Sequence, residues 1–261
     1  MDKAGILFDM DGVLYEGDNP VPGAAEVIQF VQQHNIPFLF LTNTTSRSRT
    51  ILVEKLADFD IHVSEDQILT PPMAACHWLQ ENKIEPVALF VPPATCSEFG
   101  NLHTVDWQTA EAVGAIVIGD MGNAWDFNTL NRAFRLLMNQ PHPSLVALGL
   151  TRYWQAADGL RLDTGPFVKA LEYASGQQAV VLGKPAEPFF TTANQMLGLS
   201  PDQVVMIGDD IRSDIDAAQQ CGIDGLLVRT GKCRPEDIHS VITPHAILDS
   251  VADLPAWWQA Q

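Results

Sequence analysis

The sequence contains few cysteines, few basic residues and no long apolar run. Its four cysteines, Cys76, Cys96, Cys221 and Cys233, are far apart and form no C-x-x-C pair. Neither a disulfide framework nor a cysteine zinc site is therefore expected. No apolar run approaches the ~20 residues that cross a bilayer, and the N-terminus has neither the basic start nor the long apolar stretch of a secretion signal. We expect a cytoplasmic protein with reduced thiols.

Positive charge is scarce, because 15 Lys and Arg residues stand against 32 Asp and Glu, a formal net charge of −17. A surface of this charge repels nucleic acid and anionic membranes, so neither is an expected partner. It also repels anionic substrates, unless a bound cation reverses the charge of a site. The 261 residues are otherwise of globular composition and suffice for one large domain or two smaller ones.

Short apolar runs alternate with amphipathic stretches along the chain. The clearest runs lie at 4–8, 37–41, 87–91, 115–118, 145–148, 179–182, 204–207 and 225–228. Runs of this length are typical of strands that are buried on both faces of a parallel sheet. Helices are expected at 24–33, 128–138 and 215–221, the last ending at Gly222. The alternation predicts an α/β fold with parallel strands.

Four of the expected strands are followed by residues that suit phosphoryl transfer with a divalent metal. In open parallel sheets, ligands bind beyond the carboxyl ends of the strands. If these strands lie side by side, their end residues meet in one crevice, where they can position a phosphoryl group and neutralise its charge. In chain order these residues are Asp9 and Asp11, Thr42 and Asn43, Lys184, and Asp209 with Asp214.

The two carboxylates after the first run have complementary roles. Asp9 can act as the nucleophile and form an acyl phosphate. Asp11 lies two residues further on the same side of an extended chain, so it can protonate the leaving oxygen and then activate water. Asp9 and Asp209 can hold Mg²⁺, which prefers hard oxygen ligands. The other end residues have plainer readings if taken singly: Asp214 could cap a helix, and Thr42 with Asn43 could form a turn.

At these positions the sequence resembles the haloacid dehalogenase superfamily of phosphohydrolases. The matching segments, in the family's order, are LFDMDGVLY, FLTNTT, VLGKP and VMIGDDIRSDI. The segments GDDIRSDIDAAQQCGIDGLLVRTGK and DGLRLDTGPFVKALEYA resemble its NagD-like branch. The resemblance implies a Mg²⁺-dependent phosphatase with these roles: nucleophile Asp9, acid/base Asp11, phosphate binding by Thr42, Asn43 and Lys184, metal binding by Asp9, the Asp11 carbonyl and Asp209, and support from Asp214.

The resemblance also implies a Rossmann-like parallel sheet core with helices on both faces and an inserted α/β cap domain. We place the core at 1–83 and 177–261 and the cap at 84–176. The segment TRYWQAADG, with Tyr153, Trp154 and Asp158, is a candidate for substrate choice, although both rings could instead belong to the core of the cap. The family likeness also allows a homodimer.

Three functions fit these observations. The first is hydrolysis of small phosphorylated metabolites, which extends to phosphoramidates or pyrophosphate. The second is a phosphotransferase or mutase, in which a second hydroxyl takes the phosphoryl group in place of water. The third is a non-catalytic ligand-binding protein, and the complete set of Asp9, Asp11, Lys184 and Asp209 argues against it. The physiological substrate is not predicted.

Overall fold

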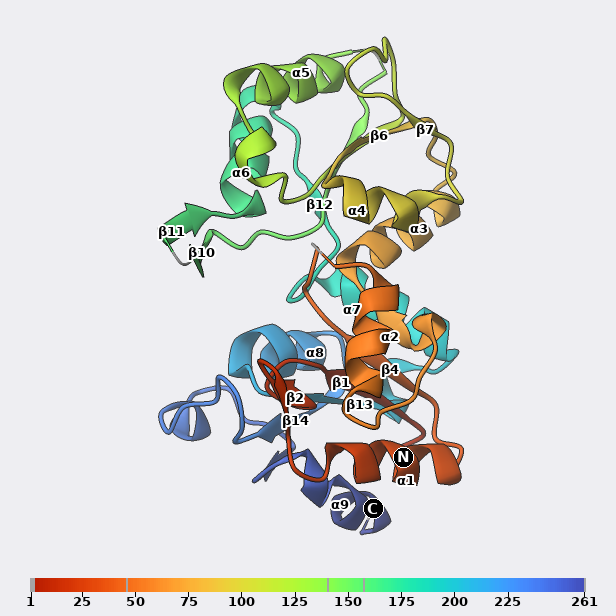
Figure 1. The fold of residues 1–261 in the computed structure, drawn as a ribbon, viewed down its shortest axis with the longest axis vertical. Helices are drawn as coiled ribbons and strands as arrows, with labels where there is room; N and C mark the ends of the chain where they lie inside the picture. Colours follow the sequence, from red (N-terminus) through yellow and green to blue (C-terminus); the bar gives the residue numbers. More distant parts are fainter. Residues whose placement is uncertain (1–2, 46, 140, 157, 261) are drawn as a thin grey trace. The chain divides into compact units, whose positions relative to one another are not determined.

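The computed structural model describes residues 3–45, 47–139, 141–156 and 158–260, which divide into two compact units (Figure 1). The core unit comprises Met1–Thr42, Arg49–Leu69 and Lys184–Gln261, and the inserted unit comprises Asn43–Ser48 and Thr70–Gly183. The span expected to form a cap, 84–176, lies within the inserted unit. Three of the four points where the chain enters or leaves this unit are neighbours, because a Cβ built on Gly183 would lie 3.3 Å from Asn43 Oδ1 and 3.4 Å from Pro71 Cγ.

The core unit contains a six-stranded parallel sheet in the order β15-β14-β13-β1-β4-β5. The first strand lies between β13 and β4, so that Leu7 is opposite both Met206 and Leu39. The predicted strands of this sheet are confirmed. The strands are β1 Gly5–Asp9, β4 Phe38–Leu41, β5 Ile68–Leu69, β13 Val204–Gly208, β14 Asp224–Val228 and β15 Ala246–Leu248.

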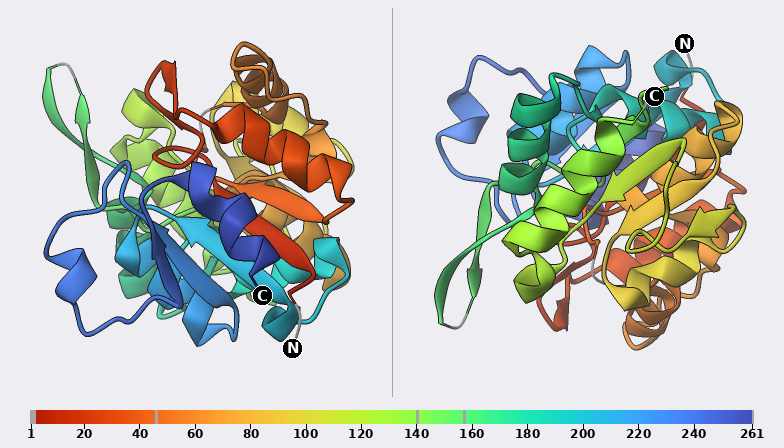
Figure 2. Two further views of the ribbon diagram at one scale, coloured as in Figure 1. Left: turned by 90° about the horizontal axis from the view of Figure 1, so that it is seen from below. Right: turned by 90° about the horizontal axis from the view of Figure 1, so that it is seen from above.

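Helical segments cover both faces of this sheet. Successive side chains of a strand point to opposite faces, so the packing of neighbouring residues shows what covers each face. Leu226 and Val228 pack in the cluster formed with α1 (Ala24–Gln33), α2 (Arg49–Ala57) and α9 (Leu254–Gln259), whereas Leu227 packs with Ile211 and Ile215. Figure 2 shows α1 and α9 together on one side of the sheet. The buried residues of α1 recur at the spacing of one helix face: Ala24, Val27, Ile28 and Val31. The core unit also contains α7 (Glu187–Leu197) and α8 (Ala217–Gln220).

The inserted unit has its own five-stranded parallel sheet, in the order β12-β9-β8-β6-β7, and a separate antiparallel pair, β10-β11. In its apolar core, Trp125 stacks on Phe90 and Phe167, with ring centroids 6.0 and 4.9 Å apart. The predicted α/β class is therefore confirmed in both units. The elements are α3 Pro71–Glu81, β6 Val87–Phe90, α4 Pro93–Cys96, β7 Thr104–Val105, β8 Ala115–Ile118, α5 Phe127–Leu137, β9 Ser144–Ala147, β10 Tyr153–Ala156, β11 Gly159–Leu162, α6 Thr164–Ser175 and β12 Val180–Val181.

The helix predicted at 215–221 begins earlier than expected. A π-helical segment, Ile211–Asp216, leads into α8, and the helical stretch ends before Gly222, which has φ of +80°. Asp210 caps its start by accepting hydrogen bonds from the N–H groups of Arg212 and Ser213. Asp210 therefore fills the capping role that the sequence left open for Asp214. No helix of the described part of the chain has the length and apolarity to cross a bilayer.

Candidate active site

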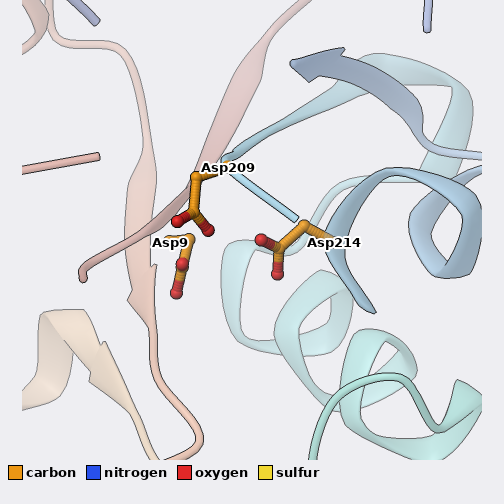
Figure 3. Close-up of side chains that lie close together, drawn as sticks. All are labelled: Asp9, Asp209 and Asp214. Carbon is orange, nitrogen blue, oxygen red and sulfur yellow. The ribbon is translucent and has the colours of Figure 1, made fainter. Parts of the chain in front are cut away.

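Three buried carboxylates meet at the carboxyl ends of β1 and β13. Asp9 is the last residue of β1, Asp209 directly follows β13, and Asp214 lies in the π-helical segment after it. One ligand atom from each lies within 4.8 Å of the other two (Figure 3). The grouping follows from topology, because β1 and β13 are neighbouring parallel strands whose ends share one sheet edge.

Lys184 supplies positive charge to these carboxylates. Its Nζ donates hydrogen bonds to Asp9 Oδ1 at 2.5 Å and to Asp214 Oδ1 at 2.7 Å. All three side chains are at least nine-tenths buried, so water screens these ion pairs little. Burial works to lower the pKa of Lys184, but the two carboxylates outweigh it and raise that pKa above its usual value. The lysine is thus held in its charged form.

Burial also raises the pKa of each of the three carboxyl groups. Desolvation is the main cause at Asp9, where the charge of Lys184 opposes it. The same two effects raise the pKa of Asp214 to about 6. At Asp209, desolvation is opposed first by the hydrogen bond from the Lys232 main chain. Because desolvation and mutual repulsion both disfavour the charged forms, a cation bound among these groups would stabilise them.

Asp209 shows how a metal ion fits this site. Its Oδ2 accepts a hydrogen bond from the Lys232 N–H at 2.7 Å, whereas its buried Oδ1 has no hydrogen-bond partner among the described residues. A buried oxygen without a donor is unfavourable, and together with Asp9 it offers the hard ligands that Mg²⁺ prefers. Asp214 differs, because its oxygens accept hydrogen bonds from Lys184 and from the Asp210 N–H. The residues present therefore fit a divalent cation held by Asp9 and Asp209.

Three further residues expected in the site, Asp11, Thr42 and Asn43, follow strands β1 and β4 of the core sheet. Asp11 follows β1, but its side chain is exposed and is not part of the group of three carboxylates. Thr42 is buried directly after β4, the other neighbour of β1, and its N–H donates to the Leu69 carbonyl. Asn43 is exposed and is the first residue of the inserted unit. The roles of these three residues stay predictions.

One part of the core site was missed in the sequence: the turn of Thr230, Gly231 and Lys232 after β14, here called the TGK turn. It contacts both the chain after β1 and Asp209. The signal was present, since these residues also follow an apolar run of the parallel sheet and lie within a segment that resembles the NagD-like branch.

The inserted unit has a cavity of about 430 Å³ beside the hairpin β10-β11. Its lining includes Trp154, Asp158 and Arg161, and the Arg161 guanidinium pairs with Asp158 at 2.7 Å. The rings of Tyr153 and Trp154 are not buried in the core of this unit, because these residues are 51% and 43% exposed. That alternative reading of the sequence is therefore wrong, and of the two rings Trp154 lines the cavity.

Comparison with known proteins agrees with the motifs. Residues 6–104 match the family model for haloacid dehalogenase-like hydrolases, and residues 181–254 match a second such model. Human phospholysine phosphohistidine inorganic pyrophosphate phosphatase is 39% identical over 239 residues, covering 90% of this chain and 86% of that protein. A p-nitrophenyl phosphatase from Archaeoglobus fulgidus has a TM-score of 0.85 at 28% identity, with both chains fully covered.

NagD from E. coli K-12 has a TM-score of 0.86 at 23% identity, covering 97% of this chain and 98% of that one, and so shares the fold. The resemblance to the haloacid dehalogenase superfamily, first read from short motifs, is confirmed.

Proposed function

Because this chain belongs to the haloacid dehalogenase-like hydrolases, we propose that it is a Mg²⁺-dependent phosphatase that hydrolyses small phosphorylated metabolites through an aspartyl-phosphate intermediate on Asp9. One observation carries the proposal: the buried Asp9 carboxylate, at the end of β1, lies 2.5 Å from Lys184 Nζ and has an oxygen within 4.8 Å of an Asp209 carboxylate oxygen. A nucleophilic carboxylate can attack an anionic phosphoryl group only where cations offset the repulsion between them.

In the proposed reaction an Asp9 oxygen attacks phosphorus, and the bond from phosphorus to the leaving oxygen breaks. Asp11 gives its proton to that oxygen. Asp11 then takes a proton from water, which attacks the phosphoryl group on Asp9 and releases inorganic phosphate. Lys184 and Thr42, with the Asn43 N–H, bind the phosphoryl oxygens.

Two further groups support this arrangement. Asp9, Asp209 and the Asp11 carbonyl would hold Mg²⁺, which would offset the negative charge of the reacting groups. Asp214 holds the Lys184 ammonium in place through its 2.7 Å hydrogen bond. Each member of the set predicted from the sequence thus has at least one task in the proposed reaction.

The human relative's name favours a second candidate activity, since it specifies phospholysine, phosphohistidine and inorganic pyrophosphate. Phosphoramidates and pyrophosphate present the same phosphoryl group to Asp9 and differ only in whether an amine or phosphate leaves. We therefore propose phosphoramidates and pyrophosphate as alternative substrates of this chain, to be compared with phosphate esters in the same assay.

Hydrolysis of p-nitrophenyl phosphate is expected to require Mg²⁺ and to stop when EDTA removes it, because Asp9 and the substrate are both anionic. The release of p-nitrophenolate measures the rate, and phosphorus NMR identifies the product. Inorganic phosphate as the sole phosphorus product, with an acceptor sugar present, indicates a hydrolase. A phosphorylated sugar instead indicates a transferase, and full activity in EDTA contradicts the role of the metal.

Trp154→Ala is expected to change the ranking of substrates by about tenfold in relative kcat/KM, because the core residues are generic and substrate choice is proposed to lie in the inserted unit. Hydrolysis of p-nitrophenyl phosphate should change only about twofold. The matched control is Tyr173→Ala, since Tyr173 is an exposed aromatic residue of the same unit that does not line the cavity. An unchanged ranking across a panel of phosphorylated metabolites removes this hypothesis.

A further inference from the structure

The TGK turn donates three hydrogen bonds, two to the segment that follows β1 and one to Asp209. The Thr230 hydroxyl donates to the Gly12 carbonyl at 2.5 Å, and the Gly231 N–H donates to Glu16 Oε1 at 2.6 Å. The third is the 2.7 Å bond from the Lys232 N–H to Asp209 Oδ2. One short turn thus binds both the segment that follows the nucleophile and the carboxylate at the end of β13.

Asp209 Oδ2 lies in a narrow slot between two glycines. A Cβ on Gly12 would come within 2.0 Å of this oxygen, and a Cβ on Gly231 within 2.1 Å. The same Cβ on Gly231 would lie 2.6 Å from Gly12 Cα, so the two main chains are themselves closely packed. Both glycines have positive φ, +91° and +65°, which side chains disfavour. The slot therefore depends on glycine at both positions and on the bonds that hold the two segments together.

We infer that the TGK turn is a positioning element of the metal site, which fixes Asp209 Oδ2 so that Oδ1 is presented to the ion. The inference rests on the proposed function, because it assumes that Asp209 is a metal ligand. A carboxylate has one plane, so a donor that fixes one oxygen also restricts the direction of the other. Mutation of residues that orient a metal ligand in this way typically weakens metal binding by about 10–100-fold. Thr230 and Glu16 are positioning residues here, because they act through Gly12 and Gly231.

Isothermal titration of the metal-free protein with Mg²⁺ tests the inference without any substrate. Thr230→Val keeps the shape of the side chain but removes the donor, and should weaken Mg²⁺ binding by about tenfold. Thr230→Ser restores the hydroxyl and should return the affinity to within about twofold of wild type. Equal affinities of the valine variant and the wild type overturn the inference. If the wild type itself binds no Mg²⁺, the proposed function fails instead.

Two further variant pairs separate position from charge, and they keep the test open if Thr230→Val folds poorly. Glu16→Gln retains an acceptor for the Gly231 N–H, whereas Glu16→Ala removes it. The alanine variant should therefore bind Mg²⁺ more weakly than the glutamine variant. Lys232→Met keeps the main-chain N–H on Asp209 and removes a nearby positive charge, so it should not weaken Mg²⁺ binding. A Lys232→Met loss as large as that of Thr230→Val contradicts a role for the main-chain contacts.

Discussion

Asp9→Asn is expected to lower kcat for p-nitrophenyl phosphate by at least about 10⁴-fold, because an amide cannot form the acyl phosphate. The change is nearly isosteric, and the amide oxygen can still accept the hydrogen bond from Lys184, so the fold should be preserved. In the wild type, rapid quenching in acid followed by mass spectrometry should find one phosphoryl group on the peptide that contains Asp9. That adduct should be absent from the variant.

The matched control is Asp60→Asn, which makes the same chemical change on the surface of the core unit. Asp60 is exposed and has φ of +59°, a conformation that asparagine tolerates as well as aspartate. Its kcat should equal that of the wild type. If Asp9→Asn keeps full activity, a covalent mechanism on Asp9 is wrong even if the protein is a phosphatase.

Lys184→Met is expected to impair both activity and stability. Its side chain neutralises two carboxylates that are themselves buried, Asp9 and Asp214. Removing one partner of a buried ion pair costs about 3–5 kcal/mol, which lowers the melting temperature by roughly 10 °C for a chain of this size. The kcat for p-nitrophenyl phosphate should fall by at least about 10³-fold, because a fixed positive charge on the phosphoryl oxygens is lost. Calorimetry of the metal-free protein measures the first effect and steady-state kinetics the second.

The stability lost in Lys184→Met should be smaller at about pH 5 than at about pH 8. The pKa of Asp214 is about 6 in the folded protein, above its usual 3.8. A carboxyl group with a raised pKa in the folded state lowers the free energy of unfolding only where it ionises. This loss is absent below about pH 4 and reaches its full size above about pH 6. Without Lys184, whose charge is the first effect opposing desolvation at both Asp9 and Asp214, both pKa values rise further. The variant then takes up protons on folding over a wider pH range.

Arg234→Met is the control for this pair of measurements, because Arg234 pairs with Glu236 at 3.8 Å on the surface and both side chains are at least 70% exposed. Its melting temperature should stay within about 2 °C of wild type, as the small value of exposed ion pairs predicts. A Lys184→Met variant as stable as this control would show that the buried carboxylates do not depend on the lysine.

Much of the fold was predictable because a parallel sheet leaves a strong signal in the sequence. Its strands are buried on both faces, so segments such as 204–207 and 115–118 read as continuous apolar runs. Short elements were missed: β5 and β7 have two residues each, too few to show a period. The hairpin β10-β11 was not predicted, since Tyr153 and Trp154 are adjacent and do not alternate with polar residues as in a half-buried strand.

The candidate site was predictable where a side chain directly follows a strand. The grouping of Asp9 and Asp209 followed from the rule that parallel strands present their carboxyl ends at one edge. Lys184 joins them although the expectation for its strand was wrong, because β12 pairs with β9 in the sheet of the inserted unit and does not lie beside β1. The separate use of each Asp209 oxygen could not be predicted, because it depends on main-chain donors that have no sequence signature. The positions of Gly12 and Gly231 show the same limit, since a close approach between two turns is a property of three-dimensional packing alone.

The junctions of the inserted unit also bear on how this family diversifies. Asn43, Pro71 and Gly183 adjoin one another, so three of the four points where the chain passes between the units are close together. A module joined in this manner can be exchanged by recombination, or accumulate substitutions, without disturbing the strand register that aligns β1 with β13. With substrate choice in the inserted unit, as proposed above, catalytic chemistry and substrate preference would be inherited separately, and new specificities could evolve on a reaction centre that stays the same.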